Sequence, residues 1–212
     1  MASLPTQPEG APNAEGAVRE PTLTSALPSS PSVKLASAQS PSFREIHDAY
    51  FGFVWRYAAN RRVPPMAIDD VVQEVFVVVY HRLASFEGRS SLKTWLAGIA
   101  HNVVRGYVRK PGNRPESDYS AEELQLLAPG WNPAEALERK AAVQLLHELL
   151  DKMSDVQREV FVLCEVEQLS SVEIAEVLGV NENTVRTRLL AARKLFNAGA
   201  ARARASQQWS RP

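Results

Sequence analysis

Apolar side chains recur at helical spacing in two separate blocks of this sequence, residues 43–110 and 137–197. Spacings of three and four residues place such side chains on one face of an α-helix. The alternation of apolar and polar residues that marks a half-buried strand occurs nowhere along the chain. The sequence therefore predicts an all-α protein with two small helical domains.

The segments outside the two blocks have a different composition. Residues 1–42 are rich in proline and serine and carry only scattered Leu and Val, too little apolar area to offset the entropy of ordering. We expect a disordered tail there. Residues 111–136 contain several prolines and lean acidic, which predicts a flexible linker with at most a short helix over 122–127. The second helical domain is expected over 137–200, and a basic tail over 201–212.

Three helices are expected in the first block. One runs from Phe43 to Arg61 and ends before Pro64-Pro65, because proline lacks a donor and clashes with the preceding turn. A second, capped by Asp69 or Asp70, runs to Leu83. A third follows a Ser90-Ser91 cap and extends through Tyr107, with residues 86–89 as the loop between.

The second block predicts a helix-turn-helix. Ser154 with Gln157 and Ser170 with Glu173 read as capping boxes. Gly179 ends a short helix over 171–178, and Asn181 caps a longer one expected over 182–197. In this motif the second helix enters the major groove of DNA.

The long helix divides into two faces. An apolar stripe at i, i+4, i+7 and i+11 is expected to pack on the short helix, and the opposite face offers hydrogen-bond donors. The stripe is Val185, Leu189, Ala192 and Phe196; the opposite face carries Asn183, Arg186, Thr187, Leu190 and Lys194, flanked by Arg188 and Arg193 for phosphates.

The charge of the chain is unevenly spread. It holds 24 basic and 24 acidic residues, for a net charge of zero. Residues 183–205 carry six basic side chains and no acid, whereas residues 137–182 carry ten acids and four bases. A zero total argues against a protein that binds DNA unaided, since phosphate contacts supply most of that affinity.

Two further surfaces stand out in the first block. Asp70, Gln73, Glu74 and Val77 share one face of the second helix, the pattern of a protein docking surface. Residues 82–110 mix aromatic and hydroxyl groups with six basic residues and one acid, Glu87. Stacking groups beside cations are typical of single-stranded nucleic-acid binding; for Trp95 alone, a core position is the stronger interpretation.

Three stretches resemble the extracytoplasmic-function (ECF) sigma factors of the bacterial sigma-70 family. Asp69-Asp70 through Gln73-Glu74 and Phe76 resembles region 2.2, and Phe86-x-Gly88-x-Ser90 through Asn102 resembles regions 2.3 and 2.4. Gln157-Arg158 through Arg193-Lys194 resembles region 4. Gly98 and Ala191 depart from the pattern, because many relatives have basic residues there, and Arg89 stands where an acid is frequent.

The resemblance implies partners and residue roles. Core RNA polymerase would be bound through its β′ clamp helices and β flap, promoter DNA would be read at the −10 and −35 elements, and an anti-sigma factor would regulate the chain. Polymerase contacts would come from Asp70, Gln73, Glu74 and Val77. The −10 contacts would be Phe86, Arg89, Ser90, Ser91, Lys93, Trp95, Asn102, Arg105, Arg109 and Lys110. The −35 contacts would be Asn183, Thr184, Arg186, Thr187, Arg188, Leu190, Arg193 and Lys194.

Other classes of protein fit the sequence less well. A stand-alone helix-turn-helix regulator leaves residues 69–110 unexplained, and a helical adaptor that binds only protein leaves the acid-free helix unexplained. The four histidines have no metal-ligand spacing and no nucleophile–base set occurs, so we expect no enzyme, metal, cofactor or small-molecule substrate.

The longest apolar run, six residues, predicts no membrane insertion, and a cytoplasmic location is expected. Cys164, on an apolar helix face, is expected to be a buried, inert thiol.

Overall fold

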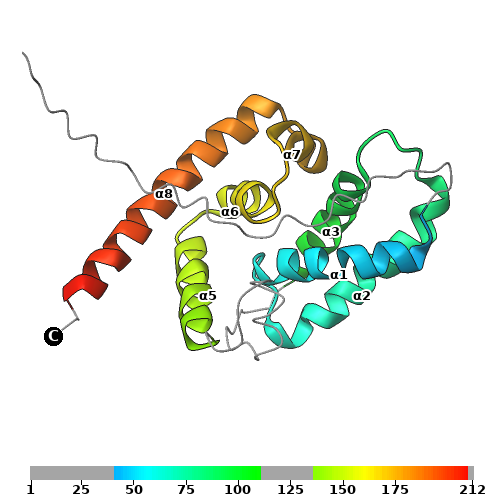
Figure 1. Ribbon diagram of the computed structural model, residues 1–212. Coiled ribbons are helices and arrows are strands. Elements are labelled where there is room, and N and C mark those ends of the chain that lie inside the picture. The colour runs from blue at the N-terminus through cyan, green and yellow to red at the C-terminus, as the bar shows by residue number, and fades with distance from the viewer. Residues whose placement is uncertain (1–40, 111–135, 210–212) are drawn as a thin grey trace, which may run out of the picture.

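The structure, a computed structural model, describes residues 41–110 and 136–209 (Figure 1). Within these two ranges the secondary structure is entirely helical, which confirms the expected all-α fold. None of the described helices is long and apolar enough to span a membrane. The expected tail over 1–42 lies almost entirely outside the described residues, and so do the linker and the short helix over 122–127.

The first block consists of α1 (Phe43–Ala59), α2 (Pro65–Arg82), a short 3-10 turn η1 (Leu83–Ser85) and α3 (Leu92–Val108). A capping box of Ser42 and Glu45 begins α1. Ser91 caps α3 as expected, because its hydroxyl accepts a hydrogen bond from the Thr94 amide at 3.0 Å.

The expected start of α2 is wrong by about one turn. The helix begins at Pro65, which occupies its first turn, and not after Asp69 or Asp70. Proline suits the first helical position, since its missing amide donor has no intrahelical partner there. Asp69 instead accepts a hydrogen bond from the indole Nε1 of Trp55 at 3.2 Å, which ties α2 to α1.

The second block consists of α5 (Ala136–Asp151), α6 (Asp155–Phe161), a π-helical turn η3 (Val162–Val166), α7 (Ser171–Leu178) and α8 (Glu182–Trp209). Gly179 ends α7 in the left-handed conformation, with φ of 63°, and the Asn181 side chain accepts a hydrogen bond from the Asn183 amide at 2.8 Å. These two features confirm the predicted turn between α7 and α8.

The long helix α8 continues past the expected end at Asn197 to Trp209. Alanine dominates residues 198–205, and alanine has the highest helix propensity. The extension packs against α5, and Gly199 is the point of closest approach: a Cβ atom there would lie 2.2 Å from Leu149 Cδ2. The expected basic tail over 201–212 is therefore helical as far as Trp209.

The two blocks share one hydrophobic core. Buried residues of α1, α2 and α3 form a continuous cluster with those of α5, α6, η3, α7 and α8. The helix α3 packs against α1 and α2 and also against α7, so it lies between the blocks (Figure 1). The helix predicted to read one DNA element is therefore in direct contact with the block predicted to read the other.

Candidate nucleic-acid interface

The polymerase-docking residues expected on α2 share one exposed surface. Asp70, Gln73 and Glu74 are all exposed, and Val77 retains 55% of its accessible surface although it is apolar. The buried face of the same helix carries Val71, Val72, Val75 and Val79. Among the described residues this acidic–amide surface is exposed, with Glu74 at the edge that faces α3.

Aromatic packing positions the loop before α3. The rings of Phe86 and Trp95 lie 5.0 Å apart, and both residues are half-buried. Gly88 has φ of 68°, a left-handed conformation that favours glycine and sets the bend of the loop. Arg89 pairs with Glu87 at the exposed tip. Trp95 therefore supports the loop and is neither fully buried nor free.

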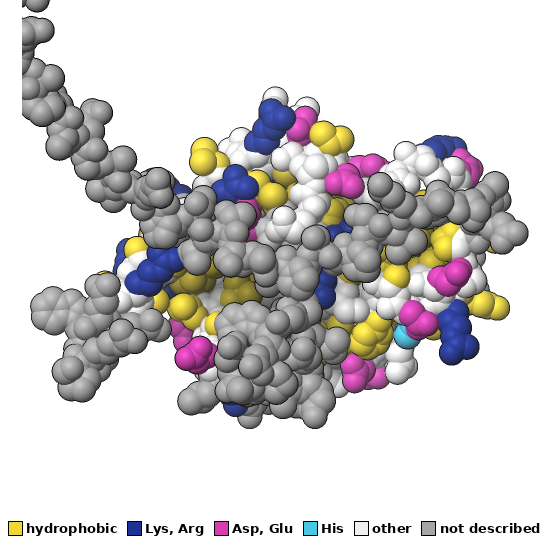
Figure 2. Space-filling model, in the orientation of Figure 1, with side chains coloured by type: hydrophobic (Ala, Val, Ile, Leu, Met, Phe, Trp, Pro, Cys, Tyr) yellow, Lys and Arg dark blue, Asp and Glu magenta, His cyan; other side chains and the backbone are white. Residues whose placement is uncertain are grey.

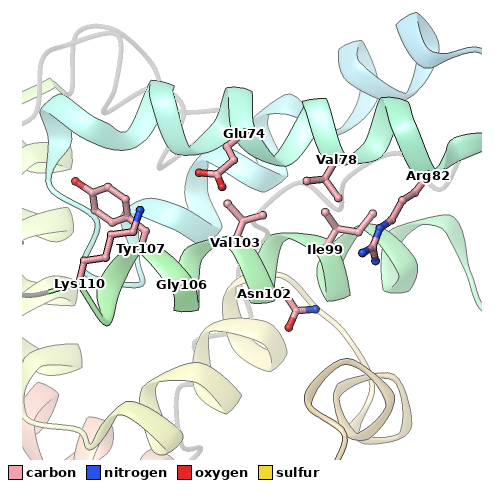
Figure 3. A pocket seen from close by; sticks show the side chains of 9 residues that line it. All are labelled: Glu74, Val78, Arg82, Ile99, Asn102, Val103, Gly106, Tyr107 and Lys110. Atoms are coloured by element: carbon pink, nitrogen blue, oxygen red, sulfur yellow. The ribbon is translucent and has the colours of Figure 1, made fainter.

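A groove of about 370 Å³ runs between α2 and α3 (Figure 3). Val78, Ile99 and Val103 line its apolar part, and Figure 3 shows Glu74 and Arg82 reaching toward it from α2. Asn102 and Lys110 also border it. Asn102 donates a hydrogen bond from Nδ2 to the Gly98 carbonyl at 2.8 Å, which fixes the orientation of its amide.

The residues expected at the −10 element do not all share this surface. Asn102, Arg105, Arg109 and Lys110 are exposed on or just beyond α3. Lys93 lies elsewhere: its ammonium donates to the Glu167 carbonyl oxygen and lies 5.5 Å from the centroid of the Phe53 ring. Desolvation lowers the pKa of Lys93. Ser91 also turns to the second block, with its hydroxyl 3.4 Å from Glu173 Oε1.

The helix-turn-helix presents the expected donor face. Val185, Leu189 and Ala192 are buried on the inner side of α8, and Ile174 of α7 is buried opposite them. On the outer side Leu190 is 72% exposed, and Lys and Arg side chains recur along α8 in Figure 2. The outer-side residues expected to contact DNA are Asn183, Arg186, Thr187, Leu190, Arg193 and Lys194, all exposed, with Thr184 and Arg188 half-buried.

Local bonds hold several of these side chains in place. Arg186 pairs with Glu182 at 2.7 Å, and Thr187 donates to the Asn183 carbonyl at 2.9 Å. Arg193 pairs with Glu165 of η3, also at 2.7 Å. Cys164 is half-buried nearby, and burial raises the pKa of its thiol, so the thiolate required for redox reactivity is disfavoured.

Sequence reasoning missed a network of charges between the two blocks. Arg56 of α1 makes two hydrogen bonds to the carboxylate of Glu167, with Nε to Oε1 at 3.2 Å and Nη2 to Oε2 at 3.1 Å. The side chain of Glu167 is completely buried, and burial raises its pKa despite the arginine. Arg56 and Glu167 lie 111 positions apart in the sequence. Helical spacing relates only residues a few positions apart, so the sequence contained no signal for this contact.

A second buried carboxylate, Glu159 of α6, has two basic partners in the first block. Arg61 Nη2 lies 2.8 Å from Glu159 Oε1, and His101 Nδ1 of α3 lies 2.8 Å from the same oxygen. Burial alone would raise the pKa of Glu159, but His101 and Arg61 bring the net shift of that pKa below its ordinary value. Arg62 binds Asp155, and Thr94 donates to Glu173 Oε1 at 2.9 Å.

The arrangement combines an exposed acidic–amide helix, an aromatic loop beside a basic helix, and a helix-turn-helix. A helix-turn-helix joined to a second helical block is typical of DNA-binding proteins that also bind a protein partner. Two family descriptions match the chain: Sigma-70 region 2 over residues 46–114, and Sigma-70, region 4 over residues 143–196.

Relatives of known function match most of the chain. It is 31% identical over 152 residues to the RNA polymerase sigma factor YlaC of Bacillus subtilis, a match covering 72% of this chain and 88% of the relative. It is 33% identical over 145 residues to the ECF RNA polymerase sigma-E factor of Escherichia coli K12, covering 65% and 76%. The chain belongs to the ECF RNA polymerase sigma factors of the sigma-70 family, and it acts as an alternative sigma factor.

Solved structures share the fold. The CnrH structure in complex with the cytosolic domain of CnrY matches with a TM-score of 0.54 and 25% identity, covering 74% of this chain and 85% of the other. The sigma factor RpoE from Bartonella quintana, in complex with the anti-sigma factor NepR, matches with a TM-score of 0.61 and 20% identity, covering 75% and 96%.

Proposed function

We propose that this sigma factor binds core RNA polymerase through the exposed face of α2. Asp70, Gln73, Glu74 and Val77 present carboxylates, an amide and an apolar side chain, and all four are exposed in the described part of the chain. In the proposal this face meets the β′ clamp helices, and the second block meets the β flap. Polymerase supplies the chemistry of initiation, so the proposal assigns no catalytic residue, metal or cofactor to this chain and places it in the cytoplasm.

The loop after η1 and the exposed side of α3 are proposed to capture the −10 element. Phe86 and Trp95 supply a stacking surface, and Asn102 offers an oriented amide at the rim of the groove. Arg89 and Ser90 belong to the same loop, and Arg105, Arg109 and Lys110 would bind phosphates. Flipping a base from the stack costs a few kcal/mol, which such contacts offset.

The outer face of α8 is proposed to read the −35 element in the major groove. The single observation that carries this part is the exposed outer side of residues 183–194, a segment with no acidic residue of its own, opposite the buried stripe of Val185, Leu189 and Ala192. Arg186 can bind guanine through two hydrogen bonds, and Thr187 or Leu190 can pack against a thymine methyl.

An anti-sigma factor is the proposed regulator. Two proteins with this fold were solved in complexes, one with an anti-sigma factor and one with the cytosolic domain of CnrY. Both blocks offer exposed apolar residues for such a partner: Val77 and Tyr80 on α2, Val172 on α7 and Leu190 on α8.

A transcription assay with purified core polymerase tests the proposal. We expect promoter-specific transcripts only when this chain is present, and we expect Asp70→Lys to abolish retention of core polymerase in a pull-down. Asp48→Lys, on the exposed side of α1, is the matched control and should bind core as wild type does. Specific DNA binding without core, and no promoter-specific transcript with it, would favour a stand-alone helix-turn-helix regulator instead.

A further inference from the structure

Two arginines on the outer side of α8 are each bonded to a carboxylate of the second block. Arg186 Nη2 lies 2.7 Å from Oε1 of Glu182, one helical turn earlier in α8. Arg193 Nε donates to Oε1 of Glu165 in η3, also at 2.7 Å. Both carboxylate side chains are 35% exposed, and the arginines are 64% and 52% exposed. The two pairs are therefore similar in burial and differ in which arginine they hold.

The positions of the two arginines along α8 suit different tasks. In a helix-turn-helix, the N-terminal residues of the second helix contact the edges of the bases. Arg186 lies in the second turn of α8, whereas Arg193 lies about 10 Å further along the helix axis, at 1.5 Å per residue. In the proposed function Arg186 accordingly binds a guanine, and Arg193 binds a phosphate.

The contact with Glu182 restricts the Arg186 side chain without using up its donors. A guanidinium has five N–H donors in a rigid fork, and a bidentate contact with guanine needs two of them. The bond from Nη2 to Glu182 Oε1 engages one. Because a long side chain loses rotamer entropy when it binds, holding Arg186 in one orientation beforehand reduces that cost. Glu182 thus favours an orientation in which Arg186 is ready to bind a base.

The same carboxylate disfavours DNA contacts that involve no base. Attraction between basic side chains and phosphates supplies the sequence-independent part of DNA binding, and a carboxylate beside Arg186 weakens that attraction. Residues 183–205 contain no acid, so Glu182 is the last carboxylate before the base-reading segment of the chain. Specificity increases when a residue weakens competing complexes as well as stabilising the correct one. Both effects of Glu182 therefore act in the same direction.

Glu182 also suits the start of a helix. It is the first residue of α8, where an acidic side chain interacts favourably with the helix dipole. That contribution stabilises the folded protein equally for every DNA sequence. An effect on the choice of base must instead depend on Arg186, so an experiment can separate the two roles.

We propose that Glu182 is a positioning residue for the −35 element: its carboxylate holds Arg186 in the orientation that binds guanine, and so sharpens the choice of base at that position. This inference rests on the proposed reading of the −35 element by α8. It gives Glu182, which was not among the expected DNA contacts, an effect on specificity without a contact to DNA of its own.

A double-mutant cycle tests the proposal. Core polymerase is combined with the full chain as wild type, Glu182→Ala, Arg186→Ala or the double variant. Competition binding compares a promoter with a panel in which each base pair of the −35 element is changed in turn. Arg186→Ala should relax the preference at the position that Arg186 reads. Glu182→Ala should reduce the preference at the same position by about 2- to 5-fold, the size that an exposed ion pair contributes, and should change nothing further once Arg186 is alanine.

Glu165→Ala is the matched control, because it removes the same charge from an equally exposed carboxylate that holds the other arginine. It should change the affinity for every promoter of the panel by one common factor and leave the preference at each position unchanged. Circular dichroism checks the helix content and thermal unfolding of each variant. If Glu182→Ala loses helix content, Glu182→Gln decides in its place, because it removes the charge and keeps the length of the side chain.

Three results would overturn the inference. A uniform change of affinity in Glu182→Ala, like that of the control, would leave Glu182 only its role at the helix end. An equal loss of preference in the Arg186→Ala background would show that the effect does not act through Arg186. In both cases the relaxed preference of Arg186→Ala would still support reading by α8. A wild-type preference that Arg186→Ala leaves intact would refute both the proposed readout by Arg186 and the role of Glu182.

Discussion

At the scale of single residues, Glu173 serves two structures at once. Its Oε2 accepts hydrogen bonds from the amide and hydroxyl of Ser170 at 2.9 and 2.7 Å, which begins α7. Its Oε1 accepts from Thr94 of α3. The capping role could be predicted from the Ser170-x-x-Glu173 spacing, because a capping box is local. The role toward α3 could not, because it depends on how two distant segments meet.

The same distinction explains the candidate site. The exposure of Asp70, Glu74 and Arg186 follows from helical periodicity, which the sequence contains. Lys93 is basic and sits among residues typical of nucleic-acid binding, yet it bonds to the Glu167 carbonyl. Whether a lysine faces solvent or a neighbouring carbonyl depends on how the two blocks pack, and that packing cannot be deduced from the amino-acid composition.

Two glycines in helices should respond oppositely to the same substitution. Gly98→Ala in α3 adds a Cβ atom with nothing within 4 Å, so the helix propensity of alanine should raise stability by about 1 kcal/mol. Gly199→Ala in α8 adds one 2.2 Å from Leu149 Cδ2, so displacement of Leu149 should outweigh that gain and lower stability. Thermal unfolding followed by circular dichroism measures both; equal shifts would contradict the close packing of α5 on α8.

His147 should make stability depend on pH. Desolvation, with Arg158 nearby, lowers its pKa from 6.5 to about 4. Between these values the unfolded chain binds a proton that the folded chain excludes. The contribution of neutral His147 to the free energy of unfolding is therefore complete above about pH 6.5. As the pH falls toward 4, the free energy of unfolding decreases by up to roughly 3 kcal/mol.

Urea unfolding at pH 7 and pH 5 measures this effect. His147→Gln should reduce the loss of stability between the two pH values, whereas His81→Gln, at an exposed position of α2, should leave it unchanged. An identical pH dependence in wild type and His147→Gln would exclude His147 as its source.

At the scale of elements, caps and turns were the most predictable features. The Ser170–Glu173 box, the left-handed Gly179 and the Asn181 cap fix α7, the turn and the start of α8, and all three are readable in the sequence. The start of α2 and the end of α8 were not predicted correctly. The start of α2 depends on Pro65, which is favourable in the first helical turn although proline disrupts a helix interior. The end of α8 depends on the alanine-rich residues beyond the apolar stripe, which favour a longer helix.

The recognition helix allows a prediction at the same scale. Arg186→Ala should weaken binding of the polymerase complex to its promoter by about 10- to 100-fold, since a bidentate contact to guanine contributes roughly 1–3 kcal/mol of discrimination. Arg44→Ala, at an exposed position of α1 remote in sequence from α8, is the control. Competition with promoters altered at the −35 element measures the effect; unchanged discrimination in Arg186→Ala would place the readout elsewhere.

At the scale of the whole molecule, the two blocks were expected and their mutual contact was not. The helical pattern identified both blocks and the composition separated them. The charge imbalance was visible in the sequence, and it pointed toward DNA and polymerase. It did not reveal that Asp155, Glu159 and Glu167 meet arginines of the first block, because long-range pairing is a property of the assembled fold.

A shared core predicts coupled unfolding of the blocks. The wild type should show a single calorimetric transition, because the two blocks share one hydrophobic core and the buried Arg56–Glu167 pair. Removing one partner of a buried ion pair costs about 3–5 kcal/mol of stability. Glu167→Gln should broaden or split the transition as one block unfolds before the other. Glu176→Gln is the exposed control. Two separate transitions already present in the wild type would contradict the coupling.

The π-helical turn η3 makes the contact between Arg56 and Glu167 sensitive to the number of residues in the chain. An α-helix rotates by about 100° per residue, and a π-helical turn contains one residue more than an α-helical turn. Removing one residue from Val162–Val166 would rotate Glu167, and with it the α7 and α8 helices that follow, around the axis relative to α6 and away from Arg56. An insertion or deletion of a single codon in this segment would therefore abolish the Arg56–Glu167 contact even where every contacting side chain is kept, so the contact depends on the length of the segment as well as on the identity of its residues.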